Sequence, residues 1–199
     1  MTLVRPRGPR LQHEARDHRS RWQERGLKLS DAGHTMPEPK PVLEIGSIYG
    51  ALFSRGDGKF HWALVVPLES DTGQDAVKMH ATNLGTGVWR YVREPDKSPN
   101  LCVVVKLGET SPLQNMVDYI DDLLKNIPML VPEEDMIMED TFTCRVWFKE
   151  AVRVLAANGI VKCLDVHSLE KEMFEYGEEN DIQTGLGYPY KAHASQYCT

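Results

Sequence analysis

The chain has 199 residues and a formal net charge of −6, and 41% of its residues are hydrophobic and 26% charged. This length predicts one domain, or one domain with a tail, and the composition is typical of a globular protein rather than a disordered or fibrous one. A membrane span of roughly 18 consecutive apolar residues is absent, the first ten residues lack the apolar stretch of a secretory signal, and the negative charge argues against nucleic-acid binding, so we expect a cytoplasmic protein.

The charge is unevenly distributed along the chain. Residues 1–40 hold nine Lys and Arg against five Asp and Glu, for a net charge of +4, so the remaining 159 residues carry −10. The first segment also has few apolar residues and four prolines. Such a segment does not repay the entropy cost of ordering it. We therefore expect a disordered basic tail over residues 1–40 and a single domain over residues 41–199.

After residue 41 the sequence changes to short β-rich runs separated by turn-rich breaks. These runs predict about five strands, at residues 47–54, 61–67, 76–83, 88–93 and 101–107. Their spacing favours an antiparallel meander. The run Leu101–Val105 is apolar at consecutive positions, which is typical of a strand buried on both faces.

The hydrophobic period then becomes helical. Ser111, Pro112 and Gln114 predict a helix start, and apolar residues follow at helical spacing as far as Leu124. A second helix is predicted over residues 143–157 and a weaker third over residues 168–176, whereas residues 184–199 show no clear period. Strands followed by helices predict the α+β class, with the meander packed against C-terminal helices.

The strongest candidate for chemistry is a cysteine at a helix start. Asp140, Thr141 and Thr143 are all suitable N-cap residues just before Cys144. In a first helical turn, unpaired backbone N–H groups favour a thiolate, which is the nucleophilic form of the side chain. The base would be His61 or His80, on two strands that are expected to pair.

The sequence alone leaves open that each of these residues has only a structural role. A buried cysteine is usually a small hydrophobe, and strand histidines are often structural. Trp62 alternates with His61 and is expected on the opposite sheet face. Trp147 lies one turn after Cys144, either in the core or in the wall of a binding site.

Three short motifs resemble those of the permuted papain-like families, namely the lecithin retinol acyltransferase-like enzymes and, more distantly, the NlpC-type peptidases. They are Phe60-His61-Trp62-Ala-Leu-Val-Val, Lys78-Met-His80, and Thr143-Cys144-Arg-Val-Trp147-Phe-Lys-Glu150. The resemblance spans residues 47–157. It implies a permuted papain-like fold, Cys144 as nucleophile, His61 as base and His80 as the residue that orients the base.

This sequence departs from the pattern of those families at three points. Thr143 replaces their asparagine, the segment between the two histidines is longer, and no hydrophobic C-terminal anchor is present. These departures bear on the substrate more than on the fold.

The resemblance implies a cysteine-dependent hydrolase or acyltransferase that forms a thioester with a small-molecule, lipid or peptide substrate. Asn83 is a second candidate to orient His61, and with Trp147 it is a candidate substrate contact. No cofactor or metal is expected. The alternatives are a catalytically silent papain-like interaction module and a small-molecule-binding domain.

The remaining features are expected to be structural. Cys102 and Cys163 are predicted core residues and Cys198 a tail residue, and all four cysteines are expected to be thiols. The acidic run Glu133–Asp140 is interpreted either as a solvated loop or as a lid that disfavours anionic substrates.

Overall fold

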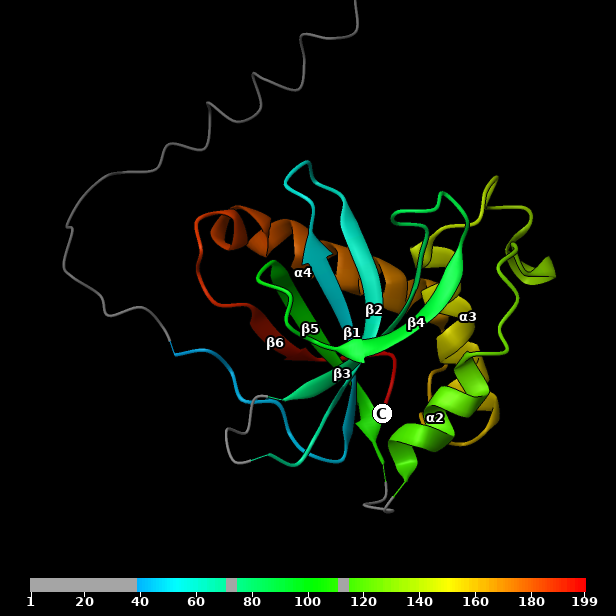
Figure 1. Cartoon of the computed structure of the whole chain (residues 1–199), viewed down its shortest axis with the longest axis horizontal. Helices are drawn as coiled ribbons and strands as arrows, with labels where there is room; N and C mark the ends of the chain where they lie inside the picture. The colour runs from blue at the N-terminus through cyan, green and yellow to red at the C-terminus, as the bar shows by residue number, and fades with distance from the viewer. Residues whose placement is uncertain (1–38, 71–74, 111–114) are drawn as a thin grey trace, which may run out of the picture. The chain divides into compact units, whose positions relative to one another are not determined.

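The structure of the chain is a computed structural model that describes residues 39–70, 75–110 and 115–199. The expected tail over residues 1–40 therefore lies outside the described residues except for its last two. The described residues form an α+β domain in which a six-stranded, mostly antiparallel sheet packs against helices (Figure 1). None of the helices in these ranges is long and apolar enough to cross a membrane.

The first four strands form a meander, and the fifth crosses back to pair with the first. The five strands are β1 (Ser47–Ser54), β2 (Phe60–Pro67), β3 (Ala76–Thr82), β4 (Arg90–Pro95) and β5 (Leu101–Glu109). The strand order in the sheet is β4-β3-β2-β1-β5-β6. The β1–β2 turn contains Gly56 and Gly58, whose φ angles of 79° and 72° are ones that side-chain-bearing residues rarely adopt. The five predicted strands are confirmed, with β4 starting two residues later than predicted, but the meander order is wrong for β5, which lies beside β1 instead of β4.

The helices follow the strands, as expected for this class. They are α2 (Met116–Leu124), the short 3-10 helix η1 (Glu133–Asp135), α3 (Cys144–Ala157) and α4 (Val166–Gly185). The predicted start of the first helix at Ser111 and Pro112 lies outside the described residues. The predicted third helix is too short, because α4 continues to Gly185. The segment without a clear period contains β6 (Lys191–Ala194), which pairs in parallel with β5.

The two faces of the sheet carry different neighbours. We call the face that packs against α3 and α4 the helix face, and the opposite one the outer face; Figure 1 looks onto the outer face, with α4 behind β1 and β2. Side chains of β2 alternate between the two faces. Trp62 and Leu64 belong to the large core cluster on the helix face, whereas Ala63 and Val65 belong to the smaller cluster on the outer face.

The acidic run before α3 is mostly exposed but contains two buried carboxylates. Asp135 is fully buried and Glu139 is 9% exposed. Arg153 binds Asp135 with both guanidinium nitrogens, and Nζ of Lys149 lies 2.6 Å from Oε1 of Glu139. Ion pairs with α3 thus hold two carboxylates of the run, whereas its other residues are exposed, as the interpretation as a solvated loop predicts. The alternative of a lid stays a prediction.

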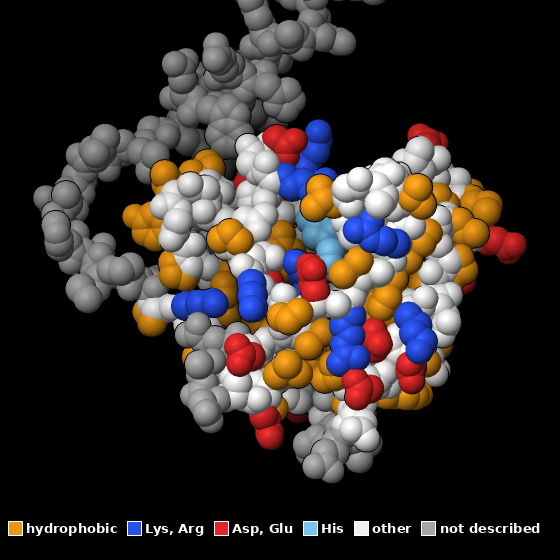
Figure 2. Space-filling view, in the orientation of Figure 1, with side chains coloured by type: hydrophobic (Ala, Val, Ile, Leu, Met, Phe, Trp, Pro, Cys, Tyr) orange, Lys and Arg blue, Asp and Glu red, His pale blue; other side chains and the backbone are white. Residues whose placement is uncertain are grey.

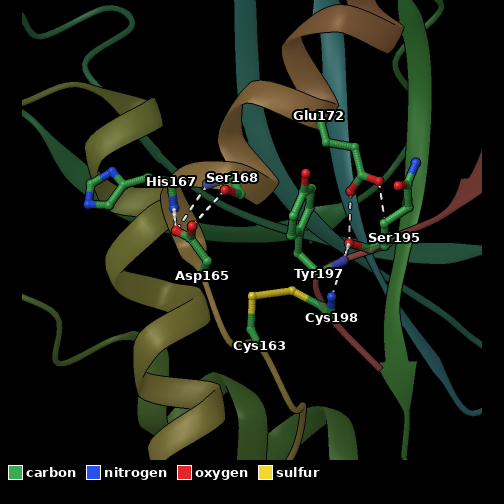
Figure 3. Close-up of a disulfide and its surroundings, with 9 residues drawn as sticks. Cys163, Asp165, His167, Ser168, Glu172, Ser195, Tyr197 and Cys198 are labelled. Atoms are coloured by element: carbon green, nitrogen blue, oxygen red, sulfur yellow. Dashed lines mark hydrogen bonds between the residues drawn. A yellow bond between two sulfur atoms is a disulfide. The ribbon is translucent and has the colours of Figure 1, made fainter.

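The C-terminal segment is tied to the connection between α3 and α4. Figure 3 shows the disulfide between Cys163 and Cys198 that makes this link. Backbone hydrogen bonds between Lys162 and Thr199 flank it. The expectation that all four cysteines are thiols is wrong for this pair, whereas Cys102 and Cys144 are free and buried. Disulfides are typical of oxidising compartments; the cytoplasmic location stays a prediction.

Candidate ligand site on the outer face

Cys144 opens α3 as the sequence predicts. Of the three candidate caps, Thr143 is the one used, and its hydroxyl accepts a hydrogen bond from the backbone N–H of Val146 at 3.3 Å. The Cys144 side chain is 5% exposed and belongs to the core cluster on the helix face. It therefore packs as a small hydrophobe in that cluster.

His61 and His80 lie on the outer face. The register pairs Val65 with Lys78 across β2 and β3, and alternation then places His61 and His80 on the same face as these two residues. The ring of His61 lies 6.3 Å from that of Phe53, which belongs to the outer-face cluster. Trp62 points the other way, as predicted, and its ring lies 5.4 Å from that of Phe148 in α3.

The structure brings the two histidines together and leaves the cysteine apart. Nε2 of His61 lies 2.6 Å from Nδ1 of His80. The sheet separates both imidazoles from Cys144, so the expected pairing of Cys144 with His61 is wrong. The physical reason is that α3 covers the face of β2 that carries Trp62, and the neighbouring position in a strand must point away from it.

The two other predicted site residues lie elsewhere. Trp147 is fully buried and its ring lies 5.8 Å from that of Tyr91, so it is a core residue rather than the wall of a site. Asn83 is exposed in the β3–β4 turn, where its carbonyl accepts a hydrogen bond from the backbone of Gly87. The group that contacts the second nitrogen of His80 is instead Glu94.

The imidazoles form the middle of a polar cluster on the outer face. We call this set the imidazole cluster: Arg55, His61, Lys78, His80 and Glu94. Nη2 of Arg55 lies 3.3 Å from Nδ1 of His61, and Nε2 of His80 lies 3.3 Å from Oε1 of Glu94. The last contact meets the distance but not the geometry of a hydrogen bond, so its attraction is mainly electrostatic.

The protons of this cluster can be assigned from the chemistry of its ends. A guanidinium only donates, so Nδ1 of His61 must accept from Arg55. The proton of a neutral His61 is then on Nε2, which donates to Nδ1 of His80. The proton of His80 is left on Nε2, facing the carboxylate of Glu94. The two hydrogen bonds thus run in one direction, from Arg55 through His61 to His80, with both rings neutral.

Electrostatics keep both rings neutral. Burial is the main cause that lowers the pKa of His61 to about 3, and the positive charges around it lower it further. Burial and the ammonium of Lys78 lower the pKa of His80 to about 4, although Glu94 opposes the shift. At neutral pH the two imidazoles are therefore hydrogen-bonding groups without charge.

Lys78 is a buried basic residue of the cluster. Its side chain is 9% exposed, and its ammonium lies 3.0 Å from Oε1 of Glu94 and 4.9 Å from the centre of the Phe53 ring. It also donates to Oγ of Ser98 at 2.9 Å. Ser98 lines a separate cavity of about 470 Å³ on the same face, together with Lys97.

Sequence reasoning missed Arg55, Lys78 and Glu94. Lys78 is two positions before His80, a spacing that places both side chains on one face of a strand. Glu94 joins them through the register of β3 and β4, which pairs it with Lys78. No group of three His, Cys, Asp or Glu within residues 39–70, 75–110 and 115–199 is arranged to hold a metal ion.

Comparison with known protein families yields a match. A family model described as a family of unknown function, DUF6540, matches residues 48–162, which is more than half of the chain. No curated protein and no solved structure matches the chain, so the likeness to papain-like families stays a prediction. The matched range contains the imidazole cluster and Cys144 alike, and the chain therefore belongs to the DUF6540 family.

Proposed function

We propose that this domain binds a small polar molecule at the imidazole cluster and does not use Cys144 for catalysis. This is the small-molecule-binding alternative that the sequence left open. The observation that carries it is the position of the sheet between Cys144 and both imidazoles.

The chemistry of the Cys144 thiol and of the two imidazoles supports the proposal. A thiol nucleophile needs a base within hydrogen-bond reach, and Cys144 lies on the opposite face of the sheet from both candidates. A general base works best when its pKa is near the working pH, whereas the pKa values of His61 and His80 are lowered to about 3 and about 4. Neutral imidazoles with fixed tautomers suit recognition better than proton transfer.

The surroundings of the imidazoles also suit a ligand. Binding sites combine apolar walls with a few polar groups in fixed positions. Here the buried ring of Phe53 lies beside that of His61, while His80 is only 6% exposed, with one nitrogen hydrogen-bonded to His61 and the other facing Glu94. Figure 2 shows histidine side chains in a hollow of the outer face, with charged side chains at its rim.

Two measurements test the proposal. Intact-mass spectrometry after incubation with p-nitrophenyl acetate should find no acetyl group that depends on Cys144, in wild type or in Cys144→Ala. In ¹⁵N NMR of the imidazoles, at least one of glycylglycine, succinate, putrescine and glucose should shift the signals of His61 and His80. The signals of His167, on α4, serve as the internal control and should stay in place.

A Cys144-dependent acetyl adduct would contradict the proposal, because it would require an activated thiol. So would a complete absence of imidazole shifts with all four probes. The two outcomes are independent, since the first concerns the helix face and the second the outer face.

A further inference from the structure

The imidazole cluster has opposite charges at its two ends. Arg55 lies at one end, at the start of the β1–β2 turn, and Glu94 lies at the other end, on β4. The two neutral imidazoles separate them. Figure 2 shows the histidines with basic side chains and a carboxylate around the hollow.

Among the residues that the structure describes, most N–H donors of the Arg55 side chain have no hydrogen-bond partner. The Arg55 side chain is exposed, and its contact within the cluster uses Nη2, which faces His61. A guanidinium carries five N–H donors in a planar fork that matches the two oxygens of a carboxylate. The remaining donors of Arg55 are therefore suited to a ligand carboxylate.

The anionic end has an unused acceptor. Lys78 and His80 both approach Oε1 of Glu94. Oε2 accepts no hydrogen bond within the described parts of the chain, and the Glu94 side chain is 44% exposed. A carboxylate oxygen in this position accepts hydrogen bonds from an ammonium group.

The middle of the hollow selects against charge. Both rings are neutral, the ring of Phe53 lies 6.3 Å from that of His61, and the ammonium of Lys78 over the Phe53 ring is already paired with Glu94. A ligand that is uncharged between its ends therefore loses least on leaving water. A dianion would meet Glu94, and a dication would meet Arg55 and Lys78.

We propose that the imidazole cluster recognises a small zwitterion, with the ligand carboxylate on Arg55, the ligand ammonium on Oε2 of Glu94 and the uncharged body against His61 and His80. Free amino acids and short peptides have this chemistry. The inference rests on the proposed function and adds the class of ligand and the role of each end.

The test uses three probes that carry different charged ends. Glycylglycine has both charges, N-acetylglycine has the carboxylate only, and glycinamide has the ammonium only. Titration of each, followed through the imidazole ¹⁵N signals, should give a dissociation constant for glycylglycine at least tenfold lower than for either single-charge probe.

Two variants test which end of the ligand binds Arg55 and which end binds Glu94. Arg55→Gln should weaken glycylglycine about tenfold without changing the affinity for glycinamide, and Glu94→Gln should weaken it without changing the affinity for N-acetylglycine. Lys59→Gln, in the same turn as Arg55, and Lys97→Gln, in the neighbouring cavity, are the matched controls and should bind as wild type. Unchanged thermal unfolding of Arg55→Gln, which alters an exposed side chain, verifies that the fold is intact.

The outcomes separate the two proposals. Equal affinity for glycylglycine and N-acetylglycine would overturn zwitterion recognition but leave a binding domain. Loss of binding in Lys97→Gln with normal binding in Arg55→Gln would move the site to the cavity and also overturn this inference. Absence of imidazole shifts with every probe would overturn both proposals.

Discussion

His80 shows how one residue can link stability to pH. Its side chain is 6% exposed, one nitrogen faces His61 and the other faces Glu94. Protonating the ring would place a charge near the ammonium of Lys78, and burial opposes that charge as well. The folded state therefore holds this imidazole in its neutral form over a wide pH range.

We predict that the domain loses stability between pH 7 and pH 5 through His80. The unfolded chain takes up the proton near pH 6.5 and the folded one only near pH 4. The stabilisation by the neutral His80 ring is complete above about pH 6.5 and is lost as the pH falls toward 4. At pH 5 the loss in the free energy of unfolding is about 2 kcal/mol. Urea unfolding of wild type and His80→Gln at pH 7, 6 and 5 checks this. An identical pH slope in both proteins would contradict it.

At the scale of elements, α3 is held by charges inside the protein. Lys149 is 1% exposed, and its ammonium contacts Glu139 at 2.6 Å and Asp135 at 3.6 Å. These carboxylates come from the loop that leads into the helix. Burying such charges is costly unless each has a partner, so the network fixes the position of the loop rather than adding net stability.

Removing one partner of this network should therefore be strongly destabilising. We expect Lys149→Met to lower the free energy of unfolding by about 3 kcal/mol, because two buried carboxylates lose a cation. Lys171→Met removes an exposed pair with Glu175 on α4 and should change it by less than about 0.5 kcal/mol. Chemical denaturation of both variants measures the difference; similar values for the two would refute the role of the buried network.

The contact between α4 and β1 depends on a glycine. A Cβ added at Gly177 would lie 2.8 Å from a methyl group of Leu52 and 3.1 Å from the ring of Phe60. Both neighbours belong to the core and have little room to move. The absence of a side chain at this position therefore lets the helix approach the sheet.

Two alanine substitutions in α4 should have different effects on stability. Gly177→Ala should destabilise the domain by about 1–2 kcal/mol, because overpacking outweighs the gain in helix propensity. Gly185→Ala, at the end of the same helix with nothing within 4 Å, should be neutral or stabilise it by up to about 0.5 kcal/mol. Melting temperatures of the two variants decide this, and a stabilising Gly177→Ala would show that the contact is looser than described.

At the scale of the whole molecule, the last residues close the fold. Glu172 on α4 accepts hydrogen bonds from the side chain of Ser195 and the backbone of Gln196, as Figure 3 shows for its side-chain contact. The Cys163–Cys198 disulfide then joins positions 35 residues apart. The segment after α4 is thus held by the sheet, the helix and a covalent link together.

We predict that the disulfide adds stability but does not hold the segment alone. Closing a loop of this length in the unfolded chain is worth about 4 kcal/mol in the chain-entropy model. The double variant Cys163→Ser/Cys198→Ser should lose about that much of its free energy of unfolding. In this variant the amides of Lys162 and Thr199 should still be protected from hydrogen exchange. Dithiothreitol should lower the free energy of unfolding of the wild type by the same amount as the double substitution does. It should leave the free energy of unfolding of the double variant unchanged. Loss of that protection would show that the link alone secures the segment.

The sequence by itself determined the class and most elements, because turn residues and hydrophobic periods act locally. It also placed Thr143 as a candidate cap, Cys144 at a helix start, and Trp62 opposite His61. Alternation says which side chains share a face of one strand, but not which face a helix covers. That choice depends on how distant segments pack, and it separates Cys144 from His61. The register of β3 and β4, which brings Glu94 to Lys78 beside His80, likewise exists only in the tertiary structure.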